Sequence, residues 1–283
     1  MLVYSVGMRR ALVLVAALAL LLTGCAAAPT VPIGVSFFQY RSDLAVRHSQ
    51  IEVHNRSTVE ITITKATFSS AWFSKTVSSA SAPSQVPAGS TIDFPVALPK
   101  GLCSSTTPKP VVTLHYTTAD GTKGATTVTP TLPFHTISSL HAEDCSLDEF
   151  QKVATITPAS ALRFQQVGDK QDALLDFTVT PTGAPGSVEI LSTQNTTLLS
   201  QTEGELRTID QTFTAASPPT VITLDFVPSR CEAHVIAEDK VGTVIPFRVN
   251  AGPYTNAVFT ISAPPAVKNQ LLDWVGDYCQ LTR

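Results

Sequence analysis

Apolar and polar residues alternate with a period of two along most of this chain. The clearest runs cover residues 59–63, 92–98, 112–116, 175–179, 222–226 and 245–249. Such short alternating runs predict β-strands with one buried face. Clusters of Pro, Gly, Ser and Asn separate them, and Asp120-Gly121 between two runs is a β-hairpin signal. Long helical segments do not alternate with these runs, so the pattern favours antiparallel sheets over a doubly wound α/β fold.

One helix is predicted, close to the C-terminus. Pro264-Pro265 is a suitable start, because proline is favoured in the first turn of a helix. Apolar side chains then recur at helical spacing, which predicts one buried face. That face consists of Val267, Leu271, Trp274, Val275 and Tyr278.

The two halves of the chain resemble each other in their cysteines. Cys103 and Cys231 each follow a predicted strand and a segment that contains proline, and the distance to the next cysteine, Cys145 or Cys279, is similar. We therefore predict two tandem immunoglobulin-like β-sandwich domains, with disulfides Cys103–Cys145 and Cys231–Cys279 and a short C-terminal helix. The alternative is one continuous β domain with crossed disulfides.

The N-terminal segment has the layout of a lipoprotein export signal. Arg9-Arg10 precedes an apolar run that ends in Leu22-Thr23-Gly24-Cys25, a lipobox-like pattern in which the Cys25 thiol receives the lipid. The apolar run is too short to span a bilayer of about 30 Å as a helix. We therefore expect residues 1–24 to be a signal peptide, 25–33 a lipidated tether, 34–147 the first sandwich and 148–283 the second.

The low content of charged residues argues against two classes of binding partner, nucleic acids and anionic lipids. The formal charge is −3 and only 14% of the residues are charged. The chain therefore lacks the basic surface of a nucleic-acid-binding protein. It also lacks a polybasic patch for anionic lipids, and we expect the N-terminal lipid to be its one attachment to the membrane. No nucleotide-binding loop or common hydrolase motif is present, and we expect no cofactor.

The densest polar cluster follows Cys231. On an extended strand His234 and Glu238 lie on the same side, where they could form half of a metal site or an acid–base pair. The alternative interpretation is structural: a histidine packed beside the disulfide and an acidic hairpin turn. The other histidines, His135 and His141 among them, have no third ligand at useful spacing, so we assign no catalytic residue and no metal ligand.

The Cys-x-x-His-x₄-Asp-Lys-x-Gly pattern of residues 231–242, together with the lipobox and the paired cysteines, resembles cell-surface lipoproteins of high-GC Gram-positive (actinobacterial) type with tandem β-sandwich halves. The resemblance implies a location on the outer face of the cell membrane and carries no activity with it.

Function follows from these features only in outline. We expect a non-enzymatic binding or scaffolding module of the cell envelope, with a protein or cell-wall partner. Its contacts should lie on loops at the sandwich ends, residues 78–87 first among them, or in a groove between the domains. One alternative is an envelope hydrolase or metal-binding protein that uses His234 and Glu238. Another is the solute-binding lipoprotein of a transporter.

Overall fold

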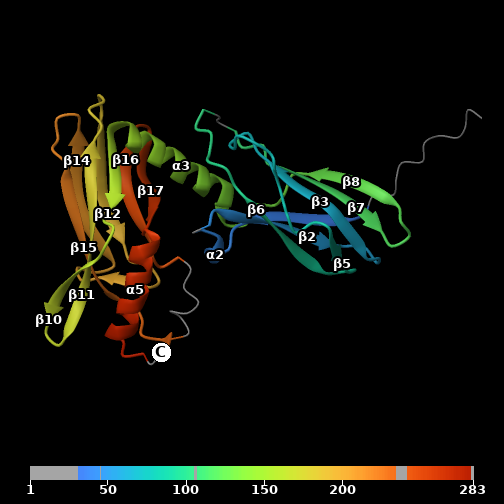
Figure 1. Cartoon of the computed structure of the whole chain (residues 1–283). Helices are drawn as coiled ribbons and strands as arrows, with labels where there is room; N and C mark the ends of the chain where they lie inside the picture. The colour runs from blue at the N-terminus through green and yellow to red at the C-terminus, as the bar shows by residue number, and fades with distance from the viewer. Residues whose placement is uncertain (1–30, 45, 105–106, 234–240, 282–283) are drawn as a thin grey trace, which may run out of the picture.

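The structure is a computed structural model, and it describes residues 31–44, 46–104, 107–233 and 241–281. Two β-sandwiches follow one another along the chain, and a long helix lies between them (Figure 1). The mainly β architecture with two tandem sandwiches and a C-terminal helix confirms the predicted fold class. None of the helices in the described ranges has the length and apolar composition of a membrane span.

The first sandwich packs a three-stranded antiparallel sheet against a five-stranded one. The smaller sheet has the order β1-β2-β6, and the larger sheet has the order β4-β3-β7-β8, with β5 also paired to β3. The strands are β1 (Ile33–Phe38), β2 (His48–Asn55), β3 (Ile61–Ser69), β4 (Val77–Ser78), β5 (Ser84–Val86), β6 (Thr91–Ala97), β7 (Val111–Thr118) and β8 (Lys123–Val128). Phe37 of the smaller sheet stacks on Phe68 of the larger one, with 3.8 Å between the ring centroids. The core is therefore closed by direct aromatic contact across the two sheets.

The second sandwich pairs a five-stranded with a four-stranded sheet. The first has the order β10-β11-β15-β13, with β9 also paired to β11, and the second has the order β14-β12-β16-β17. The strands are β9 (Ala154–Pro158), β10 (Arg163–Val167), β11 (Lys170–Pro181), β12 (Ser187–Gln194), β13 (Leu199–Gln201), β14 (Leu206–Thr214), β15 (Thr220–Pro228), β16 (Val244–Ala251) and β17 (Tyr254–Ser262). Phe177 and Phe247 meet edge to face across the two sheets, with 5.0 Å between the ring centroids.

Three helices in the described ranges complete the fold, besides a short turn of 3₁₀-helix, η1 (Pro133–His135). They are α2 (Arg41–Leu44), α3 (Thr136–Val153) and α5 (Pro265–Tyr278). Helix α5 begins at Pro265 as predicted, and Val267, Leu271, Trp274 and Val275 are buried in the second core. Tyr278, the last residue of the predicted face, is partly buried against the same core.

Helix α3 was not predicted, and it joins the two cores. Ile137 and Leu140 in its first half belong to the core of the first sandwich, whereas Phe150 and Val153 in its last turns belong to the core of the second. Position 147/148, where the sequence places the domain boundary, lies inside this helix. The two sandwiches therefore share a secondary-structure element instead of a flexible linker.

Two local predictions were wrong. The run that begins at Val59 was expected to be strand from its start, but β3 begins at Ile61. Val59 is exposed, and the Asn55 side chain donates a hydrogen bond of 2.8 Å to its carbonyl oxygen, which closes a turn there. Residues 78–87 were expected to form a loop. They instead contain the end of β4 and all of β5, which pair with β3 through backbone hydrogen bonds and extend the larger sheet.

We predict that Leu271→Ala lowers the free energy of unfolding by about 2–5 kcal/mol, because it leaves a cavity where a fully buried side chain joins α5 to the second core. Leu206→Ala is the matched control, since Leu206 is 51% exposed on β14. Its loss should change the free energy of unfolding by less than about 1 kcal/mol. Urea denaturation monitored by circular dichroism measures both. Equal effects of the two substitutions would contradict the packing described for α5.

Candidate functional site

Of the residues predicted to form sites, the structure describes the four disulfide cysteines and does not describe the others. Cys103 is bonded to Cys145 and Cys231 to Cys279, so both predicted pairings are confirmed. Cys25, His234 and Glu238 lie outside the described residues. Within the ranges that the structure covers, no cluster of three or more His, Cys, Asp or Glu side chains is arranged to hold a metal ion.

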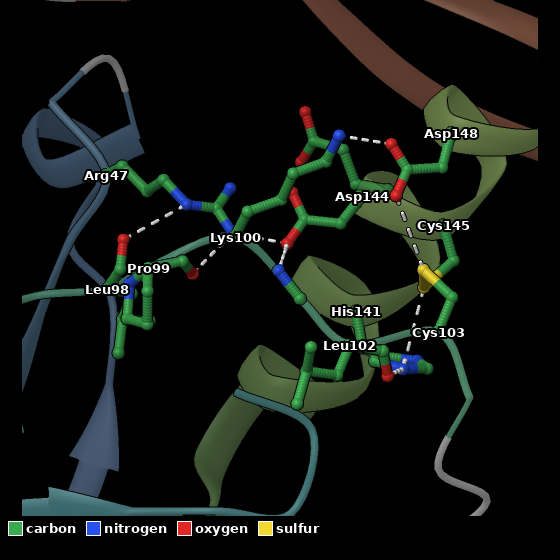
Figure 2. A network of polar contacts seen from close by, with 12 residues as sticks. Arg47, Leu98, Pro99, Lys100, Leu102, Cys103, His141, Asp144, Cys145 and Asp148 are labelled. Carbon is green, nitrogen blue, oxygen red and sulfur yellow. Dashed lines mark hydrogen bonds and ion pairs between the residues drawn. A yellow bond between two sulfur atoms is a disulfide. The ribbon is translucent and has the colours of Figure 1, made fainter. Parts of the chain in front are cut away.

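The first disulfide fastens α3 to the first sandwich. Cys103 lies in the segment that follows β6, and Cys145 lies at the middle of α3, where its side chain is fully buried. One turn before it, His141 Nε2 lies 3.0 Å from the carbonyl oxygen of Leu102, and the imidazole ring stacks on Trp72 at 4.2 Å between centroids. His141 is therefore a satisfied core histidine that holds the helix against the 101–103 segment (Figure 2).

A carboxylate completes this attachment. Asp144 is buried, and its Oδ2 accepts a hydrogen bond of 2.6 Å from the backbone N–H of Gly101 and an ion-paired hydrogen bond from Arg47. The Arg47 guanidinium also donates to the carbonyl oxygens of Leu98 and Pro99, at 3.2 and 3.1 Å. Figure 2 shows the result: one aspartate of α3 ties together two segments of the first sandwich that are distant in sequence.

A cavity opens beside this network, along α3 and between the two sandwiches. Its volume is about 600 Å³, which is within the range of small-ligand pockets. The first sandwich contributes α2 and Arg47, α3 contributes one face, and the second sandwich contributes residues 195–197, 241–246 and Thr260. We call it the interdomain groove, and its lining residues are Arg41, Leu44, Arg47, Leu140, Glu143, Asp144, Leu147, Asn195, Thr196, Thr197, Val241, Val244, Pro246 and Thr260.

Most of the charged groups of the groove are already engaged. Asp144 is held by Arg47, and Glu143 Oε1 accepts hydrogen bonds from the backbone N–H and the hydroxyl of Thr260, at 3.1 and 2.5 Å. Arg41 differs, because its exposed guanidinium has no hydrogen bond or ion pair with any residue in the described part of the chain. The groove therefore offers one available cation and several apolar side chains to a ligand.

An apolar surface continues from the mouth of the groove. A smaller cavity of about 210 Å³ shares Arg41, Leu44 and Glu143 with it and is also lined by Tyr40 and Phe134. Phe134 is 84% exposed, and its backbone has a φ of 63°. This left-handed conformation is costly for a bulky side chain. Phe134 is therefore held in a strained backbone conformation although its ring contributes nothing to the core, so its ring is available for contact with another molecule.

Tyr40 is fixed at the border of this surface. Its hydroxyl donates a hydrogen bond of 2.7 Å to Asp93. This bond, followed by burial and the nearby negative charges of Asp93 and Glu52, raises the pKa of Tyr40 to about 12. The phenol therefore stays neutral at physiological pH. The ring is held against Phe38 at 4.9 Å between centroids, so it forms a rigid part of the surface.

Sequence reasoning missed the residues that form this groove. It anticipated a groove between the domains, but neither Arg41 nor Phe134 belongs to a motif, and α2 has only four residues. The one signal that could have found Phe134 is an aromatic residue directly after Pro133, ahead of the segment that forms α3, and this signal is weak.

Comparisons with known proteins supply no family. No family model and no curated protein matches the chain. Among solved structures, a biofilm-associated protein B domain covers 81% of this chain at 8% identity and a TM-score of 0.24, with 84% of its own length matched. Red sea bream transglutaminase covers 83% at 12% identity and a TM-score of 0.21, with 31% of its own length matched. A protein of unknown function from Porphyromonas gingivalis W83 covers 82% at 13% identity and a TM-score of 0.21, with 98% of its own length matched. Likenesses this low carry no argument about function.

We predict that Asp144→Asn lowers the free energy of unfolding by about 1–3 kcal/mol, because it weakens a buried acceptor that serves both Gly101 and Arg47. Asp148→Asn is the matched control: it makes the same chemical change one turn further along α3. Asp148 pairs with Lys100, whose side chain is 56% exposed. Its replacement should therefore cost less than about 1 kcal/mol. Thermal or urea unfolding compares the two. A larger effect at Asp148 would contradict the role given to Asp144.

Proposed function

We propose that this protein is a lipid-anchored binding or scaffolding module of the cell envelope, without catalytic activity, and that it holds a protein partner in the interdomain groove. The observation that carries the proposal is the groove together with the exposed Phe134 at its mouth. A cavity bordered by exposed aromatic and aliphatic side chains is typical of protein interaction sites, where a few such residues supply most of the affinity.

Rigidity supports the proposal. The groove has walls from both sandwiches, and α3 is packed into both cores and bonded to the first by the Cys103–Cys145 disulfide. A groove whose walls are fixed in advance loses less entropy when a partner binds, which favours affinity. The sheets themselves provide no comparable concave surface that joins both halves of the described chain.

The partner should combine an apolar anchor with a carboxylate. Leu44 and Phe134 offer apolar contact area, and Arg41, which lines the same smaller cavity, offers the available charge. Arginine suits this position because its planar fork binds a carboxylate through two parallel hydrogen bonds. A segment of protein that carries an acidic residue beside an aromatic or aliphatic one matches these features.

Membrane attachment is the second part of the proposal. The lipobox-like sequence before Cys25 is its support, and a diacylglyceryl group supplies two chains, enough for stable anchoring where one chain is marginal. Two disulfides also favour an oxidising compartment outside the cytoplasm. The hydrolase or metal-site alternative with His234 and Glu238 gains no support from the described residues.

We predict that Cys25→Ala moves the protein from the detergent phase to the aqueous phase in a Triton X-114 partition of whole cells. The reason is that the Cys25 thiol is the acceptor of the lipid on which the proposed anchoring depends. Cys103→Ala with Cys145→Ala is the control, because these cysteines are internally bonded and their loss should leave partitioning unchanged. A Cys25→Ala protein that still enters the detergent phase would end the lipoprotein proposal.

We predict that a photoreactive phenylalanine analogue at position 134 gives a discrete crosslinked adduct on intact cells, because Phe134 lies at the mouth of the groove. The same analogue at Val221, which is 57% exposed on β15 of the second sandwich, should give none. Arg41→Glu should reduce the adduct at position 134 by about tenfold or more if the guanidinium binds the partner. Adducts at both positions, or an adduct insensitive to Arg41→Glu, would refute binding in this groove.

A further inference from the structure

A second cavity lies in the second sandwich, away from the interdomain groove. It is formed between α5 and the β10–β11 hairpin, and its volume is about 660 Å³. That volume falls in the range of small-molecule sites, roughly 300–1,000 Å³. The hairpin contributes Phe164 and Lys170, and α5 contributes Trp274 and Tyr278. No residue of this α5 cavity lines the interdomain groove, so its function is a separate question.

The aromatic side of the α5 cavity is rigid. The indole N–H of Trp274 donates a hydrogen bond of 2.7 Å to the carbonyl oxygen of Gln171, which fixes the indole ring against the hairpin. Tyr278 meets that ring edge to face at 5.6 Å between centroids. Phe164 on the opposite wall is 47% exposed, although it is a large apolar side chain.

The tyrosine ring already attracts a cation of the protein itself. Lys170 Nζ lies 4.3 Å from the centroid of the Tyr278 ring, inside the distance at which a cation–π interaction is significant. No carboxylate of the described residues forms an ion pair with Lys170. The ammonium group is therefore placed here by the ring face and by the surrounding field.

Negative charge dominates that field. Three carboxylates, Asp169, Asp273 and Asp277, line the α5 cavity against the one ammonium of Lys170. Asp172, which is 5% exposed and accepts no hydrogen bond from the described residues, adds a fourth charge near Tyr278.

The titration of these groups points the same way. Burial and the neighbouring Asp225 raise the pKa of Asp172. Burial, followed by the charges of Asp172 and Asp169, raises the pKa of Tyr278. Burial is the larger cause of the raised pKa in both groups. The second cause is repulsion by neighbouring carboxylates, and a bound cation would relieve that part.

We propose that the α5 cavity binds a small organic cation through an alkylammonium group, which takes the place of the Lys170 ammonium on the Tyr278 ring. Aromatic faces and carboxylates are the groups that proteins use for ammonium ligands. The wall also contains the glutamines Gln166, Gln171, Gln270 and Gln280, whose amides can bind polar atoms of the same ligand.

The test compares choline with its neutral carbon analogue 3,3-dimethylbutan-1-ol, which has the same shape without the charge. The protein has two tryptophans, so its ¹H–¹⁵N spectrum contains two indole N–H signals, and Trp72→Phe assigns the one that belongs to Trp274. We expect choline to shift the Trp274 signal saturably and the neutral alcohol to leave it in place. No shift with choline, or an equal shift with the alcohol, would overturn the proposal.

Variants separate the site from general charge attraction. Lys170→Met removes the competing ammonium and should strengthen choline binding by about threefold or more. Asp169→Asn with Asp277→Asn should weaken it by about tenfold. Glu205→Gln with Asp210→Asn changes the net charge equally, at exposed positions outside the cavity, and should leave binding unchanged. An equal loss in both double variants, or weaker binding in Lys170→Met, would refute the site, and neither result bears on the interdomain groove.

Discussion

The fold depends on one helix that is shared by two hydrophobic cores. A sandwich of about 100 residues can bury its own core, so tandem sandwiches usually need only a linker between them. Here α3 places its first half in one core and its last turns in the other, so neither sandwich is complete without it. The Cys103–Cys145 bond and the Asp144 carboxylate then fix the middle of the helix, where no apolar core surrounds it. The geometry of the interdomain groove therefore depends on how α3 is held.

The strands and the disulfides were predictable because their signals are local. A period-two run indicates one buried face, and the repeated spacing of the cysteines indicates two similar halves. Helix α5 was predictable for the same reason, since Val267, Leu271, Trp274 and Val275 keep a single continuous stripe. The strand and helix signals lie within short stretches of sequence, and the cysteine signal needs only the spacing along the chain.

Helix α3 could not be predicted because its buried face is not apolar along its whole length. Ile137 and Leu140 belong to one core and Phe150 to the other, and the residues between them that are buried include His141 and Asp144. Polar side chains on a buried face remove the periodic signal, and they are buried here only because segments far away in sequence supply their partners. The residues that line the groove escaped prediction for a related reason: they come from α2, α3 and segments of the second sandwich, and only the folded chain brings them together.

The hydrogen bonds between Glu143 and Thr260 have a consequence for self-association of the protein. β17 is the outer strand of its sheet, and an outer strand with free backbone groups can recruit a strand from another molecule. On this outer strand, the N–H of Thr260 is occupied by the Glu143 carboxylate of α3. Helix α3, which joins the domains, thus also covers the edge of this sheet. A displacement of α3 would open the groove, and it would also leave β17 free to pair with a strand of another molecule.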